Sequence, residues 1–512
     1  MFIKIAMLVV FFAVMVFIGI LCRKQSVDVN GFVLGGRSVG PWLTAFAYGT
    51  SYFSAVIFIG YAGQFGWKFG LASTWIGIGN AIIGSLLPWL ILGRRTRLMT
   101  QKLGSATMPD FFGKRFKSEA LKIVAAVIVF VFLIPYTASL YNGLGRLFEM
   151  AFKVDYVWCI IAMSILTCIY VVIGGYMATA INDFIQGIVM LVGIVAVVFA
   201  VLGSKGGLLT AVDGLSKISA DGIPEGSLTS ILGPDPFNLI CVVILTSLGT
   251  WGLPQMVGKF YAIKDERSIK KGTIISTAFA IIVAGGCYFL GGFGRLFDVD
   301  VAKNGFDAVI PTMLSGLPDI LIGIVVILVL SASMSTLSSL VLTSSSTLTL
   351  DLIKGHIVKN EMTDKKKMLI MRVFIVFFVA VSAAIAVFQY KSDSASVVNS
   401  IAQLMGVSWG ALAGAFLAPF LLSLYSKKIT KASVFACFAF GVTVMIANML
   451  FRAHFPTWLQ SPINCGAITM LAGFVIVILV SAFTPKSNKA EVDEIFTCYN
   501  KKLTTQTNDL KG

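Results

Sequence analysis

The sequence predicts an all-α polytopic membrane protein. Of its 512 residues, 57% are hydrophobic and only 12% are charged, with a mean hydropathy of +0.89, whereas soluble domains carry about 25% charged residues. Apolar runs of about twenty residues, the length that crosses a bilayer as a helix, recur from end to end. Only helices and closed barrels span membranes, and these runs are much longer than barrel strands. We therefore expect membrane-spanning helices.

About thirteen such runs follow one another along the chain. The first lacks a basic leading segment and a cleavage site, so we expect a retained span. The expected spans are 2–22, 42–66, 71–93, 121–150, 156–175, 183–203, 235–258, 273–294, 319–348, 369–389, 399–424, 432–451 and 465–484. The segment 204–234 is a polar connection rich in Gly and Ser, and the residues after Pro485 form a short polar tail that we expect to be mobile.

The positive charges predict the orientation of the spans. With the N-terminus outside, 30 of the 40 Lys and Arg residues fall in the inner segments, as the positive-inside rule requires. The C-terminal tail is then cytoplasmic. We expect a multi-pass protein of the cell membrane, and the sequence leaves its oligomeric state open.

Several function classes are excluded by what the chain lacks. The net charge of +16 lies in the connections between spans, which argues for the lipid bilayer and against nucleic acid as a partner. The sequence holds no P-loop, GxSxG or HExxH motif, and its inner connections are too short for an ATPase domain. We therefore expect no enzyme, and any uphill transport has to be driven by an ion gradient.

Two spans are interrupted near their middles. The second carries a cluster of Gly, Thr, Ser and Tyr at Gly49–Ser54, and the seventh carries Gly249-Thr-Trp-Gly-Leu-Pro254. Pro removes a backbone donor and breaks a helix. Two broken helices five spans apart predict a transporter built from inverted repeats, with its binding site near the bilayer midplane. The alternative is a pair of packing kinks at small residues.

The ninth span carries a run of hydroxyl residues. Ser335, Ser338 and Ser339 share one helix face, with Ala332 one turn earlier and Thr336 beside it. Hydroxyl and freed carbonyl oxygens are hard neutral ligands that suit a cation such as Na⁺. The alternative is a Ser/Thr-rich packing face.

Asp183 stands at the expected start of the sixth span. A carboxylate there caps a helix, together with Asn182, or it binds a cation. Since the ninth span runs inward, its hydroxyl face is expected at the same depth as Asp183, and both interpretations stay open.

These stretches together resemble the sodium:solute symporter family. The resemblance is carried in order by Gly35-Gly36-Arg37, Thr107–Phe116, Tyr136–Ser139, Gly145–Phe148, Gly174–Gln186, Leu253–Phe260 and the serine span ending Thr349–Asp351.

The resemblance implies a LeuT-type core of two inverted five-helix repeats. The repeats would occupy residues 41–203 and 235–424. The remaining parts would be the first helix and inner loop at 1–40, the outer loop at 204–234, two further spans at 425–485 and the cytoplasmic tail at 486–512.

It also implies the ligands of Na⁺, the coupling ion. The first site would use the carbonyls of Thr50, Phe53 and Ala332 with the hydroxyls of Ser335 and Thr336. A subset of the family has a second site, and its matching positions are Asp183, Ser335, Ser338 and Ser339. We therefore expect two Na⁺ per solute.

The solute is expected between the two breaks. Its predicted contacts are Ser51, Tyr52, Ser54, Tyr136, Thr250 and Trp251. Val56 and Ile57 stand where the sugar branch has polar groups, which disfavours a sugar, and Tyr136–Ser139 is similar to the proline branch. That branch, however, carries an aspartate at the position of Tyr52 and aromatic residues at those of Thr246 and Thr250.

We expect a symporter that imports a small carboxylate-bearing solute, either an amino acid such as proline or sialic acid. The alternatives are another solute (a monocarboxylate, pantothenate or a sugar), a transporter-like sensor, and a channel.

Overall fold

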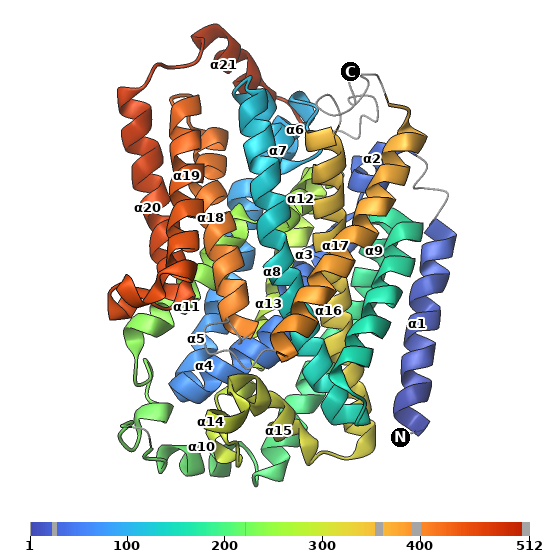
Figure 1. The fold of residues 1–512 in the computed structure, drawn as a ribbon, viewed down its shortest axis with the longest axis vertical. Helices are drawn as coiled ribbons and strands as arrows, with labels where there is room; N and C mark the ends of the chain where they lie inside the picture. Colours follow the sequence, from blue (N-terminus) through green and yellow to red (C-terminus); the bar gives the residue numbers. More distant parts are fainter. Residues whose placement is uncertain (1, 23–27, 221, 354–361, 392–400, 504–512) are drawn as a thin grey trace.

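The computed structural model describes residues 2–22, 28–220, 222–353, 362–391 and 401–503. Within these ranges the chain is helical, and the only β structure is two isolated bridges. The helices stand roughly side by side, with short helices at both ends of the bundle (Figure 1). One end, called here the α21 end, carries α6 (Arg94–Lys102), α7 (Met108–Arg115) and α21 (Lys489–Phe496). The other end, called the α10 end, carries α10 (Leu208–Ser216), α14 (Val301–Asn304) and α15 (Val309–Ser315).

Nine long helices lie close to the expected spans, because each apolar run is bounded by polar residues that end the helix. Six of them begin and end within three residues of the predicted bounds. The nine are α1 (Phe2–Cys22), α8 (Glu119–Phe152), α9 (Tyr156–Ser204), α13 (Glu266–Gly291), α16 (Asp319–Thr347), α17 (Asp364–Lys391), α18 (Ile401–Tyr425), α19 (Lys431–Leu450) and α20 (Pro462–Phe483).

The described residues contain 11 helices long and apolar enough to cross a membrane, or 12 if one bent pair is a single span. The difference from the expected thirteen has a physical origin. The stretch Val56–Lys102 counts as one helix of 47 residues, yet a straight helix of that length would measure about 70 Å, twice the hydrocarbon thickness. Gly70, with φ +60° and ψ −138°, divides it into the expected second and third spans.

Both predicted interruptions are present. Helix α3 (Pro41–Tyr52) ends at Phe53, whose backbone is extended with φ −98° and ψ 122°, and the chain turns helical again at Ala55 and continues through α4 (Ala62–Phe69). Helix α11 (Pro236–Leu248) is followed by a 3-10 turn (Gly249–Gly252), by extended Leu253 and by α12 (Pro254–Tyr261). The bend between the two halves is 46°.

The predicted start of the sixth span is wrong by eight residues. The kink in α9 lies at Gly175, with φ 58° and ψ −158°, and the sixth span runs from Gly175 to Ser204. Asp183 therefore lies two turns inside a helix and does not cap its start. Because glycine adopts positive φ without strain, the break falls there and not at the polar pair Asn182-Asp183.

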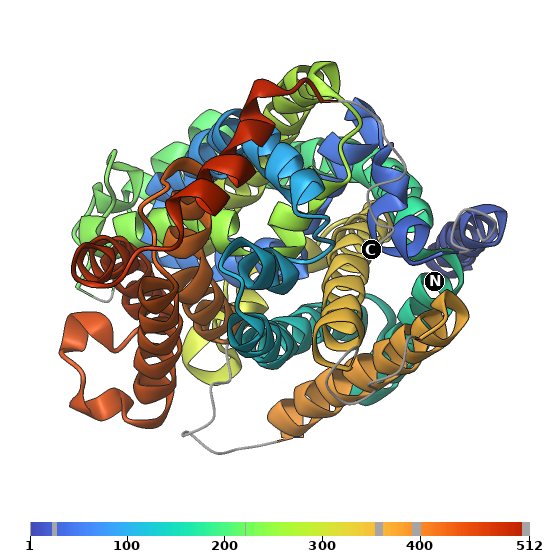
Figure 2. The ribbon, with the colours of Figure 1, turned by 90° about the horizontal axis from the view of Figure 1, so that it is seen from above.

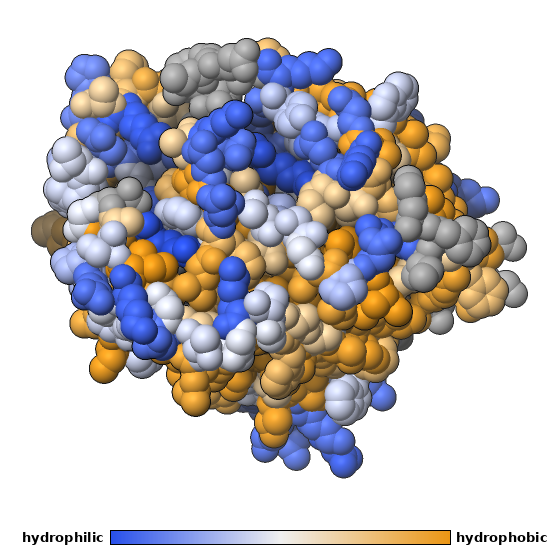
Figure 3. Space-filling model, turned by 90° about the horizontal axis from the view of Figure 1, so that it is seen from below, coloured by the Kyte–Doolittle hydropathy of each residue, from blue (hydrophilic) through white to orange (hydrophobic). Residues whose placement is uncertain are grey.

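Helix α16 lies in the middle of the bundle, packed on α3, α8 and α9. Helix α1 lies at the edge beside α9, and α19 and α20 lie at the opposite edge beside α18 (Figure 2). At the α10 end, hydrophilic residues cover part of the face and hydrophobic residues border it (Figure 3). Because α16 lies in the middle of the bundle and packs on α3, it is the element that the first broken helix contacts.

The segments expected on the inner side meet at the α21 end. Arg37 donates to Ser105 O at 2.7 Å and to Tyr261 O at 3.2 Å, and Lys102 pairs with Glu494 at 3.1 Å. At the α10 end, Lys205 of the expected outer loop donates to Leu296 O at 2.8 Å. The expected inner segments thus lie together at one end of the bundle.

Part of the C-terminal tail is helical, although the sequence predicted a mobile segment after Pro485. Residues 489–500 form α21 (Lys489–Phe496) and a 3-10 turn (Thr497–Asn500). The guanidinium of Arg95 lies over the rings of Tyr425 and Tyr499, at 4.0 and 4.5 Å, and the Tyr499 hydroxyl donates to Leu424 O at 2.7 Å. The expectation of a mobile tail is wrong for these residues, because their side chains contact α6 (Arg94–Lys102) and α18. Residues 504–512 lie outside the described ranges.

Candidate ion and solute site

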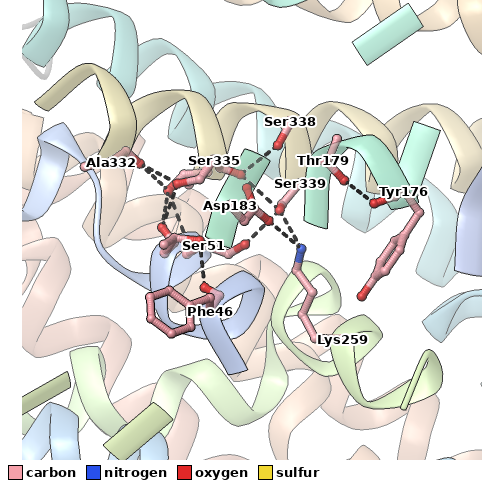
Figure 4. A network of polar contacts seen from close by, with 12 residues as sticks. Phe46, Ser51, Tyr176, Thr179, Asp183, Lys259, Ala332, Ser335, Ser338 and Ser339 are labelled. Carbon is pink, nitrogen blue, oxygen red and sulfur yellow. Dashed lines mark hydrogen bonds and ion pairs between the residues drawn. The ribbon is translucent and has the colours of Figure 1, made fainter. Parts of the chain in front are cut away.

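The break after α3 meets the hydroxyl face of α16. Ser335 Oγ and Thr336 Oγ1 lie 3.0 and 3.2 Å from Thr50 O, and each lies 3.0 Å from Ala332 O one turn earlier in α16. All four residues are buried. Four of the five oxygens predicted for the first sodium site therefore converge on one point (Figure 4).

The fifth predicted ligand is the carbonyl of Phe53, the residue at which α3 ends. A residue outside the helix has a carbonyl free to turn from the helix axis, as a site for a hard cation needs. A further contact fixes the break, since Ala55 N donates to Ser333 Oγ at 3.2 Å. The described residues form no cluster of three or more His, Cys, Asp or Glu side chains that could hold a metal ion. The ligands predicted for the first sodium site are neutral carbonyl and hydroxyl oxygens.

A buried lysine lies beside the predicted ligands of the second sodium site. Lys259 Nζ, from α12, donates to Ser339 Oγ at 2.9 Å and lies 3.6 Å from Asp183 Oδ2. Ser339 Oγ also lies 2.8 Å from Ser51 Oγ on the first broken helix. Ser338 Oγ donates to Ser335 O at 2.9 Å. The lysine joins the two broken helices to α9 and α16 (Figure 4), and the second sodium site stays a prediction.

Two of the predicted solute contacts, Ser54 and Tyr136, form a buried polar group with Trp409 on α18. Ser54 Oγ and Trp409 Nε1 both face Tyr136 OH, but none of these three atoms makes a hydrogen bond of normal geometry to another described residue. The ring of Tyr136 meets that of Trp409 edge-on at 5.8 Å. Buried polar groups in proteins are normally paired, so this region is suited to a polar solute.

The other four predicted contacts are already engaged. Tyr52 OH donates to Thr246 O, Thr250 Oγ1 to Ser247 O at 2.9 Å, and Trp251 Nε1 to Ile83 O at 2.8 Å. Ser51 belongs to the network of Lys259. These side chains fix the two breaks in the arrangement described.

Sequence reasoning missed Lys259 and Trp409. Lys259 was counted as the first residue of an inner connection, although α12 extends to Tyr261 and the side chain is buried. The local signal that the span continues is Pro254, which stands at the first position of α12, where proline is favoured in helices. Trp409 lies in a uniformly apolar helix, where no pattern separates a site residue from a packing residue.

Two cavities lie on either side of this region. One of about 50 Å³ opens toward the α21 end and is lined by Tyr176, Gln255, Lys259 and Ser339 among others. The other, of about 1120 Å³, lies at the α10 end and is lined by Gln64, Trp67, Asn238 and Arg295 among others. The predicted solute contacts between them are buried, as expected for a protein that admits its ligand from one side at a time.

A bundle with two broken helices, a neutral oxygen site between the first of them and α16, and cavities toward both ends is typical of a secondary transporter. The chain belongs to the sodium:solute symporter family, whose model matches residues 32–441.

The chain is similar over nearly its whole length to curated transporters. It is 29% identical to an osmoregulated proline transporter of Bacillus subtilis, over 94% of this chain and 95% of that one. It is 28% identical to a sodium/proline symporter of Staphylococcus aureus, over 97% and 94%.

Among solved structures, a Na⁺-coupled sialic acid symporter in an outward-open state matches with a TM-score of 0.73 at 15% identity, over 96% of this chain and 99% of that one. The nucleobase-cation symporter Mhp1 matches with a TM-score of 0.50 at 16% identity, over 91% and 98%. These likenesses bear on the fold, and they confirm the predicted LeuT-type class.

The protein is thus a multi-pass membrane transporter that imports a small solute with Na⁺ as the coupling ion. The predicted family, fold class and coupling ion are confirmed.

Proposed function

We propose that Na⁺ binds where Thr50, Phe53, Ala332, Ser335 and Thr336 meet, and that this ion couples solute import to the sodium gradient. The observation that carries the proposal is the approach of two α16 hydroxyls to Thr50 O, at 3.0 and 3.2 Å. Each hydroxyl can donate to Ala332 O within its own helix, which leaves its lone pairs for a cation.

The coupling follows from which elements supply the ligands. Thr50 and Phe53 belong to the first broken helix, whereas the other three belong to α16. A bound Na⁺ therefore holds these two elements together and favours the state that accepts solute, and its release lets them separate. A ligand shifts such an equilibrium only through its preference for one state, so sodium and solute each stabilise the loaded form.

The proposed solute carries a carboxylate and lies at Ser54 and Tyr136. Their polar atoms are buried and make no hydrogen bond of normal geometry to a described residue. The helix that resumes at Ala55 begins at the break, where the first amides of a helix lack partners within it, and of these Ala55 N already donates to Ser333 Oγ. Amides at a helix N-terminus favour a negative group. Because the curated relatives are named as proline transporters, proline is the first solute to test, with sialic acid and short monocarboxylates beside it.

We place the α21 end in the cytoplasm and the N-terminus outside, in the cell membrane. The support is the positive-inside rule together with the contacts among the basic inner segments, such as Arg37 with Tyr261 O and Lys102 with Glu494.

The test is uptake of labelled proline, sialic acid and monocarboxylates by proteoliposomes under an inward sodium gradient. Saturable uptake of one of them that needs Na⁺ would support the proposal, and the double variant of Ser335 and Thr336 to Ala should need more Na⁺. The competing proposal is a second Na⁺ at Asp183, Ser335, Ser338 and Ser339, which would give two ions per solute.

A further inference from the structure

A positive side chain is buried at the centre of the transport machinery. Lys259 is 4% exposed and Asp183 is 1% exposed, and their charged atoms lie 3.6 Å apart. The ammonium also lies 5.3 Å from the centre of the Tyr176 ring. A buried charge is tolerated when it is paired and hydrogen-bonded, and here the partners of the ammonium come from α9 and α16.

The surroundings of Lys259 are those of a bound cation. The ammonium has one carboxylate, one hydroxyl and one aromatic face around it, from Asp183, Ser339 and Tyr176. Asp183 and Ser339 are also half of the four positions predicted to hold a second Na⁺. The carboxylate of Asp183 has no hydrogen bond shorter than 3.5 Å to the described residues, and its ion-pair partner among them is the ammonium of Lys259, 3.6 Å away.

The charge of the pair leaves no need for a second ion. One carboxylate and one ammonium sum to zero, and the described part of the chain brings no further acidic cluster together that could hold a metal ion. A Na⁺ at Asp183 would lie next to the ammonium, where two like charges repel strongly in a medium of low dielectric constant.

We propose that the ammonium of Lys259 takes the place of a second Na⁺, so that this chain binds a single sodium ion. The inference deepens the proposed function and rests on it for the role of the neighbouring first site. The lysine links Asp183 on α9 to Ser339 on α16, and Ser339 contacts Ser51 on the first broken helix. It thus cross-links the elements that a second ion would join.

A tethered cation differs from a sodium ion because it cannot leave. Lys259 and Ser339 line the small cavity that opens toward the α21 end, so opening of that end can hydrate the pair, yet the charge returns with the protein. The chain therefore carries one fewer charge across the membrane in each cycle than a two-sodium symporter. At 100 mV each charge changes the attainable gradient about fiftyfold.

The test counts sodium sites with Na⁺ alone, which makes it independent of the solute. Binding of ²²Na⁺ to the purified full-length protein is titrated at pH 8 for the wild type, Lys259→Gln and the double variant Lys259→Gln/Asp183→Asn. A matched control is Lys4→Gln, because Lys4 is also buried and pairs with an aspartate, Asp319, at 2.9 Å, but lies at the edge of the bundle on α1.

We expect one site in the wild type and in Lys4→Gln, two in Lys259→Gln, and one again in the double variant. Two sites in the wild type would overturn the proposal, and this result needs no variant to fold. An unchanged count in a folded Lys259→Gln would also overturn it. Failure of the proposed function would give a different result: the wild type would bind no Na⁺, or its binding would not depend on Ser335 and Thr336. The second sodium site expected in Lys259→Gln depends on Asp183 and tests only the role of the lysine.

Discussion

Removing the two hydroxyls of the first sodium site should weaken the binding of Na⁺, so that transport needs a higher Na⁺ concentration. Ser335 Oγ and Thr336 Oγ1 supply two of five proposed oxygens and contact Thr50 O at 3.0 and 3.2 Å. If each contributes about 1 kcal/mol, the Ser335→Ala/Thr336→Ala variant should lose about 2 kcal/mol of sodium binding, and 1.4 kcal/mol is a factor of ten. We expect the Na⁺ concentration for half-maximal uptake to rise at least tenfold.

The assay is solute uptake into proteoliposomes over a range of external Na⁺, with a fixed membrane potential. Ser345→Ala is the matched control, because Ser345 is buried in the same helix and donates only to Leu342 O, at 3.2 Å. That variant should keep the wild-type sodium dependence. An unchanged half-maximal concentration in a folded double variant would refute the assignment of this site.

Three further predictions follow from the packing. Ser54→Ala or Tyr136→Phe should raise the KM for solute more than the half-maximal Na⁺ concentration in uptake assays, because the open polar atoms are lost; equal solute affinity would move the pocket elsewhere. Gly66→Ala should lower the unfolding temperature strongly, since its Cβ would lie 2.1 Å from the backbone of Gly291, whereas Gly285→Ala meets nothing within 4 Å and should be tolerated. Arg95→Ala should cost about 1–2 kcal/mol of stability in thermal unfolding, because its contacts with the rings of Tyr425 and Tyr499 and its hydrogen bond to Leu424 O are lost; an unchanged unfolding temperature would show that these contacts add no stability.

The hydroxyl run and the two breaks could be predicted from sequence because their signals are local. Ser335 and Thr336 stand at a fixed spacing on one helix, and Pro254 cannot continue the hydrogen bonds of the helix before it. The limits of most spans could be predicted for a similar reason, since a change from apolar to polar residues marks each end.

The environment of Asp183 could not be predicted in the same way. Its ammonium partner lies 76 residues further along the chain, in a short half-helix whose length depends on packing against α3 and α16. In the sequence, a lysine at the edge of an apolar run looks like one of the loop charges that orient a membrane protein. Only the three-dimensional arrangement shows that Lys259 is buried. The break at Gly175 coincides with the predicted end of the fifth span, whereas the sixth span begins directly there and not at 183, because the polar residues before Asp183 are helical and do not form a connection.

The central claim, that a sodium gradient drives solute import through this chain, is tested most directly by uptake against a gradient. Proteoliposomes holding the purified protein are given labelled proline, sialic acid or a short monocarboxylate, with Na⁺ outside and K⁺ inside. We predict accumulation of one of these solutes above the external concentration, and its loss when Na⁺ is equal on both sides and the membrane potential is clamped at zero. Accumulation that persists with K⁺ in place of Na⁺ would contradict the account.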